Sequence, residues 1–507
     1  MGLLFYPRGG SAQVVRYLSG ALAGTGWKPV LAVGSLGERG LQTNASTFFG
    51  RDDVAVVDYS AAVGAFERGN DPMLAVPPMH PSFEDRPDVP DRIFAGVSMA
   101  QAERQTQAWL RVIEDPWREV EVCHLHHLTP IHDAVSQLWP DRPVVTHLHG
   151  TELKMLELIA RLRRIGLRLG TDLAGMARRA RAGALPGFEV LEDDDRLVAE
   201  ETRWACWEFA DHWVQRLGAA ARSTSRFICI SPHDRDLAVR LLGLAAERFT
   251  VIPNGVDTEI FEQRDPTLEE RRSLWRRWLV DQPLGWDESG DPGAVAYGED
   301  VLDRFVNPFS GRAAPVILFV GRFLGFKRVP LLVRAYGRAS PLFEQPAPLV
   351  VWGGSPGEWE GEHPHSVAVE EGIDGVYFVG WRGHDELPLG LACSAVLAAP
   401  SVDEPFGQVF LEAMSCGLPV ITTASGGPLS FVNTDATQPN GWLVPPDDVD
   451  ALADALVEAV NDEAAREERA ENACRQIRAA YAWSALAERF VDVYERALAG
   501  TAIGKSK

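Results

Sequence analysis

The sequence lacks several features that define whole classes of protein. Its 507 residues contain no apolar run of eighteen or more, so we expect no membrane-spanning helix. No basic leader precedes Leu3, so we expect no secretory signal. No C-x-x-C pair occurs, and the dispersed cysteines favour reduced thiols in a cytosolic protein; they lie at positions 123, 206, 229, 393, 416 and 474.

Positive charge is also scarce. The chain has 49 Lys and Arg against 71 Asp and Glu, which gives a net charge of −22. A surface with this balance repels nucleic acid and anionic lipid over most of its area, so we expect no nucleic-acid partner. Hydrophobic residues make up 46% of the sequence, which is enough for buried sheets. Because 507 residues exceed what one core holds, we predict two or three domains.

Short apolar runs alternate with helical patterns along most of the chain, which is typical of α/β domains with doubly wound parallel sheets. The predicted strands of the first half are 3–6, 29–33, 54–57, 120–125, 144–148, 227–230 and 250–252. Those of the second half are 316–320, 349–352, 376–379, 395–399 and 420–422.

Two acidic residues follow the predicted strand 395–399. The spacing from Gly407 onward predicts a helix that opens soon after this strand, which places Glu404 in the turn and Glu412 about two turns into the helix. Ligands of open α/β sheets bind at the carboxyl ends of the strands, and the N–H groups of a helix N-terminus suit a phosphate. We interpret the two carboxylates as hydroxyl-binding groups on either side of a diphosphate. The alternative is a pair of solvated acids on an ordinary strand–helix unit.

The motif Glu-Pro-Phe-Gly over 404–407, with Glu-Ala-Met at 412–414, Gly-Leu-Pro-Val-Ile at 417–421 and Gly-Gly at 426–427, resembles the donor-site signature of family 4 retaining glycosyltransferases. The resemblance implies the GT-B fold, an α/β fold of two facing Rossmann-like domains, here with helical insertions. It also implies a nucleotide diphosphate sugar as co-substrate and no cofactor. The family commonly has Gly-Gly-x-x-Glu, whereas this chain has Ser430 at the acidic position, which affects details of donor recognition.

The resemblance assigns roles to residues of this motif. It implies that Glu412 binds the ribose hydroxyls and that Glu404 positions the hydroxyls of the sugar. Phe406 and Gly407 belong to the same donor-binding segment.

A domain organisation follows from the same resemblance. We predict an N-terminal acceptor domain over 1–260, an insertion or linker over 261–312, and a C-terminal donor domain over 313–483. A last helix within 484–507 is expected to cross back onto the first domain.

A basic loop follows the first strand of the second domain. Arg322 and Lys327 leave this loop where the next helix begins, so both charges can reach a diphosphate at the helix N-terminus. In the resembled family, the corresponding Arg and Lys bind the donor diphosphate. The alternative is that both are ordinary surface residues.

Two loops of the first domain also match the family. Gly9 and Gly10 follow the first strand and permit close approach of the backbone to a sugar or phosphate. His149 ends the predicted strand 144–148 and corresponds to a histidine that the family places near the transferred sugar. The resemblance implies donor binding for the glycines and a catalytic role for His149.

Several histidines end neighbouring strands, which raises the question of a metal. His124, His126 and His127 lie at the end of the strand next to the one that His149 follows. We expect strand spacing to turn His126 and His127 to opposite faces, and we identify no carboxylate or cysteine that completes a ligand set. The acidic triplet 193–195 is interpreted as part of a solvated run. We therefore expect no bound metal.

The segment 154–181 predicts a basic amphipathic helix within an insertion over about 152–225. It carries eight basic and two acidic residues, and apolar residues recur every three or four positions. Such a helix can lie on an anionic membrane or contact a phosphorylated acceptor. The alternative is that it packs on its domain, with its arginines facing the acidic run 189–195.

A second insertion over 264–312 contains Trp275, Trp278 and Trp286 among arginines. We expect either a packed helical hairpin or an oligomer contact. The oligomeric state itself cannot be predicted from the sequence.

The sequence thus predicts a cytoplasmic, metal-independent, retaining glycosyltransferase of the hexosyltransferase type. The donor is expected to be a UDP-sugar, and the acceptor a hydroxyl of a small molecule or glycan. The alternatives are a non-catalytic sugar-nucleotide-binding protein and a sugar-nucleotide epimerase of the same fold.

Overall fold

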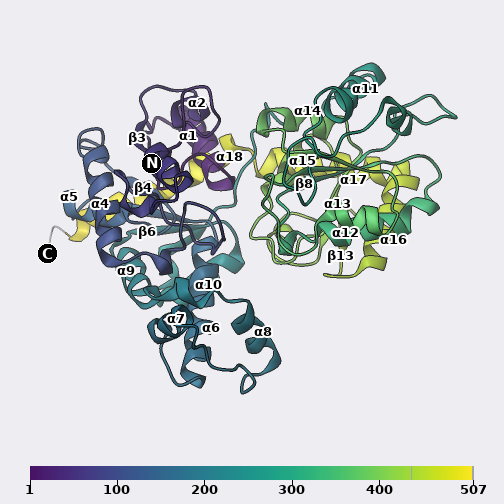
Figure 1. Cartoon of the computed structure of the whole chain (residues 1–507). Coiled ribbons are helices and arrows are strands. Elements are labelled where there is room, and N and C mark those ends of the chain that lie inside the picture. The colour runs from purple at the N-terminus through teal and green to yellow at the C-terminus, as the bar shows by residue number, and fades with distance from the viewer. Residues whose placement is uncertain (436, 505–507) are drawn as a thin grey trace. The chain divides into compact units, whose positions relative to one another are not determined.

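The computed structural model describes residues 1–435 and 437–504. Its contacts divide the chain into two compact units, one of Met1–Pro253 with the segment from Leu486 onward, and one of Asn254–Ala485 (Figure 1). Each unit has one parallel β-sheet covered by helices, which confirms the predicted doubly wound α/β fold.

The first unit contains a seven-stranded sheet in the order β3-β2-β1-β4-β5-β6-β7, with parallel pairing throughout. The strand order reverses between β1 and β4, and such a switch point opens a crevice at the carboxyl ends of the strands. The strands are β1 Gly2–Leu3, β2 Ala32–Ser35, β3 Ala55–Asp58, β4 Cys123–His126, β5 Val144–Leu148, β6 Arg226–Cys229 and β7 Phe249–Val251.

Helices cover this sheet, and the last helix of the chain joins them. In Figure 1 the yellow helix α18 lies among the purple and blue elements of the first unit. Its residues Phe490 and Tyr494 are buried there. The helices are α1 Gly10–Leu22, α2 Ala45–Phe49, α3 Ser60–Glu67, α4 Met99–Ile113, α5 Ile131–Leu138, α6 Thr151–Arg168, α7 Leu173–Arg181, α8 Asp193–Glu201, α9 Ala210–Ser223, α10 Pro232–Leu242 and α18 Trp483–Gly504.

The second unit contains a six-stranded parallel sheet in the order β10-β9-β8-β11-β12-β13. Here the order reverses between β8 and β11, so the loops that follow these two strands are neighbours. The strands are β8 Ile317–Gly321, β9 Leu349–Gly353, β10 Val376–Gly380, β11 Val396–Ala399, β12 Val420–Thr423 and β13 Gly441–Val444. The helices are α11 Leu268–Arg276, α12 Val329–Ala339, α13 Pro364–Glu370, α14 Leu387–Ala392, α15 Gln408–Ser415, α16 Val449–Asn461 and α17 Glu463–Ala480.

The single basic helix predicted over 154–181 is two helices, so this prediction is wrong in detail. The chain turns at Gly170, whose φ of +73° is a backbone conformation that glycine adopts readily, and α6 and α7 lie on either side of it. Figure 1 shows α6, α7 and α8 together at one end of the first unit.

The alternative in which this segment packs on its own domain is the one that the structure shows. The apolar side of the two helices is buried, including Ile159, Leu162 and Met176. Arg161 Nε donates to Asp195 Oδ1 at 2.8 Å, which pairs the basic side with the acidic run. Because its apolar side is occupied by the domain, this segment does not offer that side to a membrane.

The tryptophans of the second insertion also belong to the core of their unit. Trp275 stacks on Phe305, and the indole of Trp278 lies 4.8 Å from that of Trp352, measured between ring centroids. Trp286 is buried as well. These side chains form a packed insertion and leave no indole surface for an oligomer contact. Within residues 1–435 and 437–504, no helix combines the length and apolar character needed to cross a bilayer.

Candidate active site

Two loops meet at the carboxyl edge of the second sheet. One follows β8 and contains Arg322 and Lys327, and the other follows β11 and contains Glu404. Because β8 and β11 are adjacent, the loops run side by side, and the Val402 N–H donates to the Phe326 carbonyl at 2.8 Å. Residues 77 positions apart in sequence are thereby brought into contact.

Lys327 and Glu404 form a largely buried ion pair. Lys327 Nζ donates to Glu404 Oε2 at 2.5 Å, and the two side chains are 16% and 10% exposed. Arg322 is more exposed, and its Nη2 lies 3.6 Å from Glu358 Oε2. The loop therefore holds two cations beside the helix start, and each of them has a carboxylate that an anionic ligand can replace.

The start of α15 requires glycine at its N-cap. Gly407 has a φ of +84°, and a Cβ at this position would lie 2.4 Å from the Phe410 ring. The backbone N–H groups of the first turn of α15 point toward the same loop edge, where they can bind an anion.

The glycine pair after β12 holds the loop that carries Glu404. A Cβ at Gly426 would lie 2.5 Å from the Glu404 carbonyl oxygen, and one at Gly427 would lie 2.5 Å from Phe406 Cα. The Gly427 N–H donates to the Glu404 carbonyl at 2.7 Å. Small residues are needed here because the two backbones are in contact.

Phe406 and Ser430 help to hold this loop in place. The Phe406 ring is buried and lies 5.5 Å from the Phe431 ring, so it anchors the loop in the core. Ser430, which stands where the resembled family has an acid, donates through Oγ to the Gly427 carbonyl at 2.6 Å. Its hydroxyl therefore contacts the glycine turn.

Glu412 is a buried carboxyl on α15. It is 4% exposed, and burial raises its pKa to about 8, so the neutral form predominates at neutral pH. A basic atom, His384 Nε2, lies 3.7 Å from Glu412 Oε1. A carboxyl kept in a dry site at this cost is typical of a functional position. His384 was not singled out from the sequence, because it lies 28 positions before Glu412 in a segment without a motif.

In the first unit, Gly9 is the N-cap of α1, and Gly10 is its first residue. Gly9 has a φ of +77°, and a Cβ built on it meets no atom within 4 Å, so the space in front of this loop is open. Arg8 in the same loop pairs with the buried carboxylate of Asp91, which also accepts from Arg86 Nη2 at 2.6 Å. The two guanidinium groups are part of the reason that the pKa of Asp91 is lowered.

His149 lies at the carboxyl end of β5, just before α6. It is 8% exposed, and burial holds its pKa well below the usual value, so its imidazole is neutral at neutral pH. Its Nε2 lies 3.0 Å from His126 Nδ1, and its ring stacks on that of His147. A neutral imidazole has one nitrogen that donates a hydrogen bond and one that accepts, which suits hydrogen bonding to sugar hydroxyls.

Neighbouring histidines and one carboxylate lie close to His149. His127 follows the end of β4 with a φ of +63°, and this turn brings its ring to 4.5 Å from that of His149, so His126 and His127 both lie beside His149. A carboxylate lies beside His127 and His149, although it is not part of the group of described ligand atoms that lie close enough together to hold one ion. Glu152 is fully buried, accepts from the His149 N–H at 3.2 Å and lies 3.1 Å from His127 Nδ1.

Glu152 was missed because it was assigned to the insertion. Its sequence signal is a carboxylate in the first turn of a helix, four residues after the end of a strand. In that position a side chain can turn back to the N–H groups of the preceding loop.

Comparisons with known proteins identify the family. Residues 305–476 match the family described as "Glycosyl transferases group 1" and residues 8–260 match "Glycosyltransferase Family 4". A D-inositol 3-phosphate glycosyltransferase of Stackebrandtia nassauensis is 31% identical over 364 residues, which cover 64% of this chain and 72% of the relative. The chain belongs to glycosyltransferase family 4, as its motifs predicted, and the family match makes it a transferase.

Other relatives are matched over less of their length. A D-inositol 3-phosphate glycosyltransferase of a Nocardioides species is 35% identical, and the match covers 37% of this chain and 42% of that relative. The chain thus spans less than half of that protein. Maize sucrose-phosphate synthase is 26% identical over 59% of this chain and 27% of its own length.

Solved structures show the fold. Sucrose-phosphate synthase from Thermosynechococcus elongatus has a TM-score of 0.56 and 19% identity, with 98% of this chain and 99% of that chain covered. The Anabaena protein HepE in complex with UDP and glucose has a TM-score of 0.59 and 16% identity, with 97% and 98% covered. These likenesses confirm the predicted GT-B fold.

Proposed function

We propose that this chain transfers a hexose from a UDP-sugar to a hydroxyl group of a small polar acceptor, with retention at the anomeric carbon. The observation that carries the proposal is the largely buried pair of Lys327 and Glu404 beside the N-terminus of α15, with Arg322 in the same loop as Lys327. These groups supply positive charge for a leaving diphosphate and a carboxylate for sugar hydroxyls.

Each residue has a distinct part in the proposal. Lys327 and Arg322 bind the diphosphate together with the N–H groups that follow Gly407. Glu404 accepts hydrogen bonds from the sugar, and Glu412 accepts them from the two ribose hydroxyls. Glu412 must give up its proton to serve as a full acceptor, and the dry site then strengthens each hydrogen bond that it makes.

Two segments of the first unit also have roles in the proposal. His149 contacts the sugar during transfer, and its buried ring is held by His126 and His147. Gly9 and Gly10 leave the start of α1 open, so that backbone N–H groups there can bind the donor.

The difficult step is loss of the diphosphate while an oxocarbenium-like sugar forms. Positive charge placed in advance on the leaving group lowers this barrier. Lys327 and Arg322 provide that charge from the protein itself, so we propose that the diphosphate is stabilised without a metal ion. Retention follows if the acceptor attacks from the face that the diphosphate leaves, with a leaving phosphate oxygen as the base.

The substrates are proposed from the names of similar proteins. UDP is favoured because the Anabaena neighbour was solved with UDP and with UDP-glucose. A phosphorylated cyclitol is the first acceptor to test, because relatives are named D-inositol 3-phosphate glycosyltransferases.

We also propose that the protein acts in the cytosol. All six cysteines are free, and four of them are buried in the two units. Thiols left unpaired in this way suit a reducing compartment.

Thermal stabilisation by nucleotides tests the donor assignment. Wild type, Glu412→Ala and Lys327→Ala are heated with UDP, GDP, ADP and their glucose conjugates. The surface variant Arg338→Ala is the control. The guanidinium of Arg338 on α12 pairs with exposed Asp450 on α16 and belongs to neither loop of the candidate site. We expect stabilisation by the uridine nucleotides in wild type and control, and its loss in the two site variants.

Product analysis with UDP-glucose then separates the classes of function. A glycosyltransferase gives a glucosylated acceptor, and an α-linked product from the α-linked donor establishes retention. A sugar-nucleotide-binding protein without turnover leaves the donor unchanged, and an epimerase converts the donor without an acceptor. If no nucleotide stabilised the protein, the assignment of the donor site would be wrong.

A further inference from the structure

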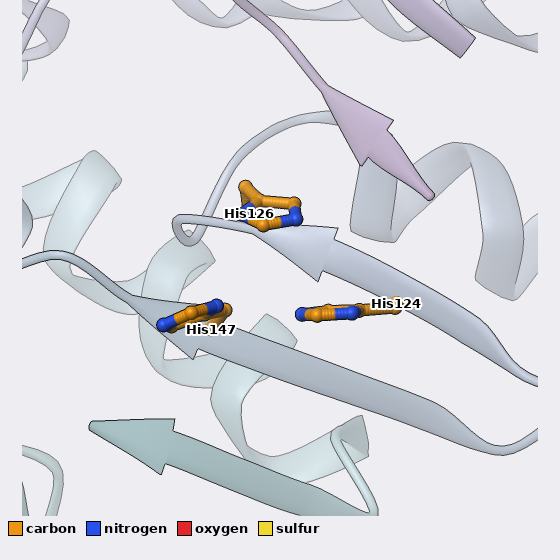
Figure 2. Close-up of side chains that lie close together, drawn as sticks. All are labelled: His124, His126 and His147. Atoms are coloured by element: carbon orange, nitrogen blue, oxygen red, sulfur yellow. The ribbon is translucent and has the colours of Figure 1, made fainter. Parts of the chain in front are cut away.

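The first unit contains a cluster of three histidines, none of which has a direct contact with substrate in the proposed transfer reaction. His124 and His126 lie two residues apart on β4, and His147 on β5 pairs in register with His126. Because side chains on one face of a strand recur every second residue, the three rings share one face of the sheet. Figure 2 shows them together, with His124 and His126 on one strand and His147 on its neighbour.

The ring nitrogens of this triad converge. One ligand nitrogen from each ring lies within 4.8 Å of those of the other two. In Figure 2 a nitrogen of His124 and a nitrogen of His147 lie on the edges that face each other, and His126 lies beside them. The three side chains are at most 3% exposed.

Several of these nitrogens are buried without a hydrogen-bond partner among the described residues. They are Nε2 of His124, Nε2 of His126, and both ring nitrogens of His147. A neutral imidazole carries one donor and one acceptor, and a buried polar atom without a partner is costly. A buried nitrogen of this kind in a native structure is expected to bind a water molecule or an ion.

The other nitrogens of His124 and His126 are already engaged. His124 Nδ1 lies 2.8 Å from the Tyr494 hydroxyl of α18, and His126 Nδ1 lies 3.0 Å from His149 Nε2. This arrangement orients both rings through Nδ1 and leaves Nε2 for a ligand. Metal-binding histidines are commonly held by an outer partner on the second nitrogen in this way.

We propose that His124, His126 and His147 bind a divalent transition metal ion, most suitably Zn²⁺. Neutral imidazoles are preferred ligands of Zn²⁺, and three of them leave one position of a tetrahedral ion for a water or another donor. Zn–N bonds of about 2.0–2.1 Å require the rings to rotate inward from their present separation. The ion would give the orphaned nitrogens a partner and join β4 to β5 beneath α18.

This site is separate from the charged residues that bind the donor, although His126 and His147 also pack against His149. Its ligands lie in the first unit, whereas Arg322, Lys327, Glu404 and Glu412 belong to the second. The earlier expectation of no metal considered His126 with His127, whereas the triad uses His147 on the next strand. The proposal therefore concerns an ion that stabilises the sheet, and it does not place a metal on the diphosphate.

Metal content and Co²⁺ spectroscopy test the proposal on the full-length, untagged chain. The protein is produced with Zn²⁺ in the medium, dialysed against metal-free buffer and analysed for bound metal. A second sample is unfolded with a chelator and refolded with Co²⁺. We expect about one Zn²⁺ per chain and a visible Co²⁺ absorption of the intensity typical of tetrahedral sites.

The variant His147→Phe removes one ligand and keeps an aromatic ring of similar size in the stack. Neither ring nitrogen of His147 has a hydrogen-bond partner among the described residues, so the substitution breaks no side-chain hydrogen bond there. The control is His233→Phe on α10, an exposed histidine outside the triad. We expect metal affinity to fall on the order of tenfold or more in His147→Phe and to remain in the control.

Equal metal content in wild type and His147→Phe, or no stoichiometric metal in either, would overturn the proposal. The triad would then be a packed stack of imidazoles. If His147→Phe does not fold, His124→Phe replaces it. In either case anomalous diffraction at the zinc edge from wild-type crystals provides a second test. The proposal requires an anomalous peak among the three rings, and the absence of that peak would contradict it.

Discussion

At the scale of single residues, the donor site is a set of charges held in a partly dry environment. Lys327 and Glu404 neutralise each other at 2.5 Å in the free protein, and Glu412 remains neutral through burial. The site therefore keeps little net charge until a ligand arrives. When a diphosphate sugar binds, we expect Lys327 to exchange Glu404 for the diphosphate, so that its positive charge becomes available to the leaving group.

Removal of the Lys327 ammonium is expected to slow transfer. Lys327→Ala should lower kcat/KM by about a hundred- to thousandfold, or about 3–4 kcal/mol, because the charge acts on the departing diphosphate. Initial rates at several donor concentrations measure this, with Arg338→Ala as the control. A change confined to KM would contradict a role in the transition state, since it would indicate equal binding of donor and transition state.

The buried Glu412 carboxyl is expected to make stability depend on pH. Its pKa is about 8 in the folded chain and near 4.5 when unfolded, so the folded state retains a proton that the unfolded state loses in this window. The contribution of this group is fully present below about pH 4.5 and is lost as pH rises through 8. Glu412→Gln has no proton to lose and should be more stable than wild type by about 4 kcal/mol at pH 8.

Urea denaturation at pH 5 and pH 8 measures this difference. The gain of Glu412→Gln should be small at pH 5 and large at pH 8, while nucleotide binding is weakened at both. Glu370→Gln, on the exposed end of α13, is the matched control and should show no such pH dependence. A gain that is the same at both pH values would show that the carboxyl is ionised when folded.

At the scale of secondary structure elements, the site depends on backbone contacts between loops. The loop that carries Glu404 is held between α15 and the glycine pair after β12, where atoms of the two backbones are in contact. This explains why the glycines of the motif occur as a pair, and why the phenylalanine beside them is buried.

A methyl group at Gly427 is expected to displace the donor loop. Its Cβ would lie 2.5 Å from both Phe406 Cα and the Pro405 carbonyl oxygen, and backbone atoms cannot move aside as a side chain can. Gly427→Ala should cost about 1–3 kcal/mol of stability and weaken UDP binding. Calorimetric titration and thermal unfolding measure both effects.

Gly20 provides the comparison for this prediction. It lies within α1, and a Cβ there meets no atom within 4 Å, so Gly20→Ala should raise stability by about 0.5–1 kcal/mol. If Gly427→Ala were as well tolerated as Gly20→Ala, the loop contact would not constrain the site.

At the scale of the whole molecule, the chain forms two units, and the first is discontinuous in sequence. Helix α18 completes the core of the first unit, where Phe490 is fully buried and Tyr494 contacts His124. The last turns of the chain therefore stabilise a sheet whose strands lie in its first half.

A cavity beneath α18 is expected to lower the stability of the first unit and to leave that of the second unchanged. Phe490→Ala should destabilise the first unit by about 3–5 kcal/mol, because a large buried side chain is removed. Hydrogen exchange should then become faster in β4 and β5, with β8 and β9 unchanged. The exposed neighbour Glu488 gives the control variant Glu488→Ala. Equal acceleration in both sheets would contradict two separate cores.

Comparison of sequence and structure shows where local patterns are sufficient. β5 has the predicted limits, and the predicted strands 349–352 and 420–422 each differ from β9 and β12 by one residue at the end. These strands are buried on both faces, so their apolar runs are uninterrupted. β13 was not predicted, because its run Gly441–Val444 is short and begins with glycine. The basic segment was predicted as one helix because its apolar period continues across the turn at Gly170.

The sequence alone determined the fold class, the family and the donor motif. Each of these depends on local periodicity and on residues close together in the chain. Tertiary structure decided which side chains contact one another. It pairs Lys327 with Glu404, places His384 beside Glu412, and places Glu152 beside His127. It also brought the histidines of β4 and β5 to one face. Such contacts depend on which strands are neighbours and on how each chain segment turns after its strand, and no local pattern contains that information.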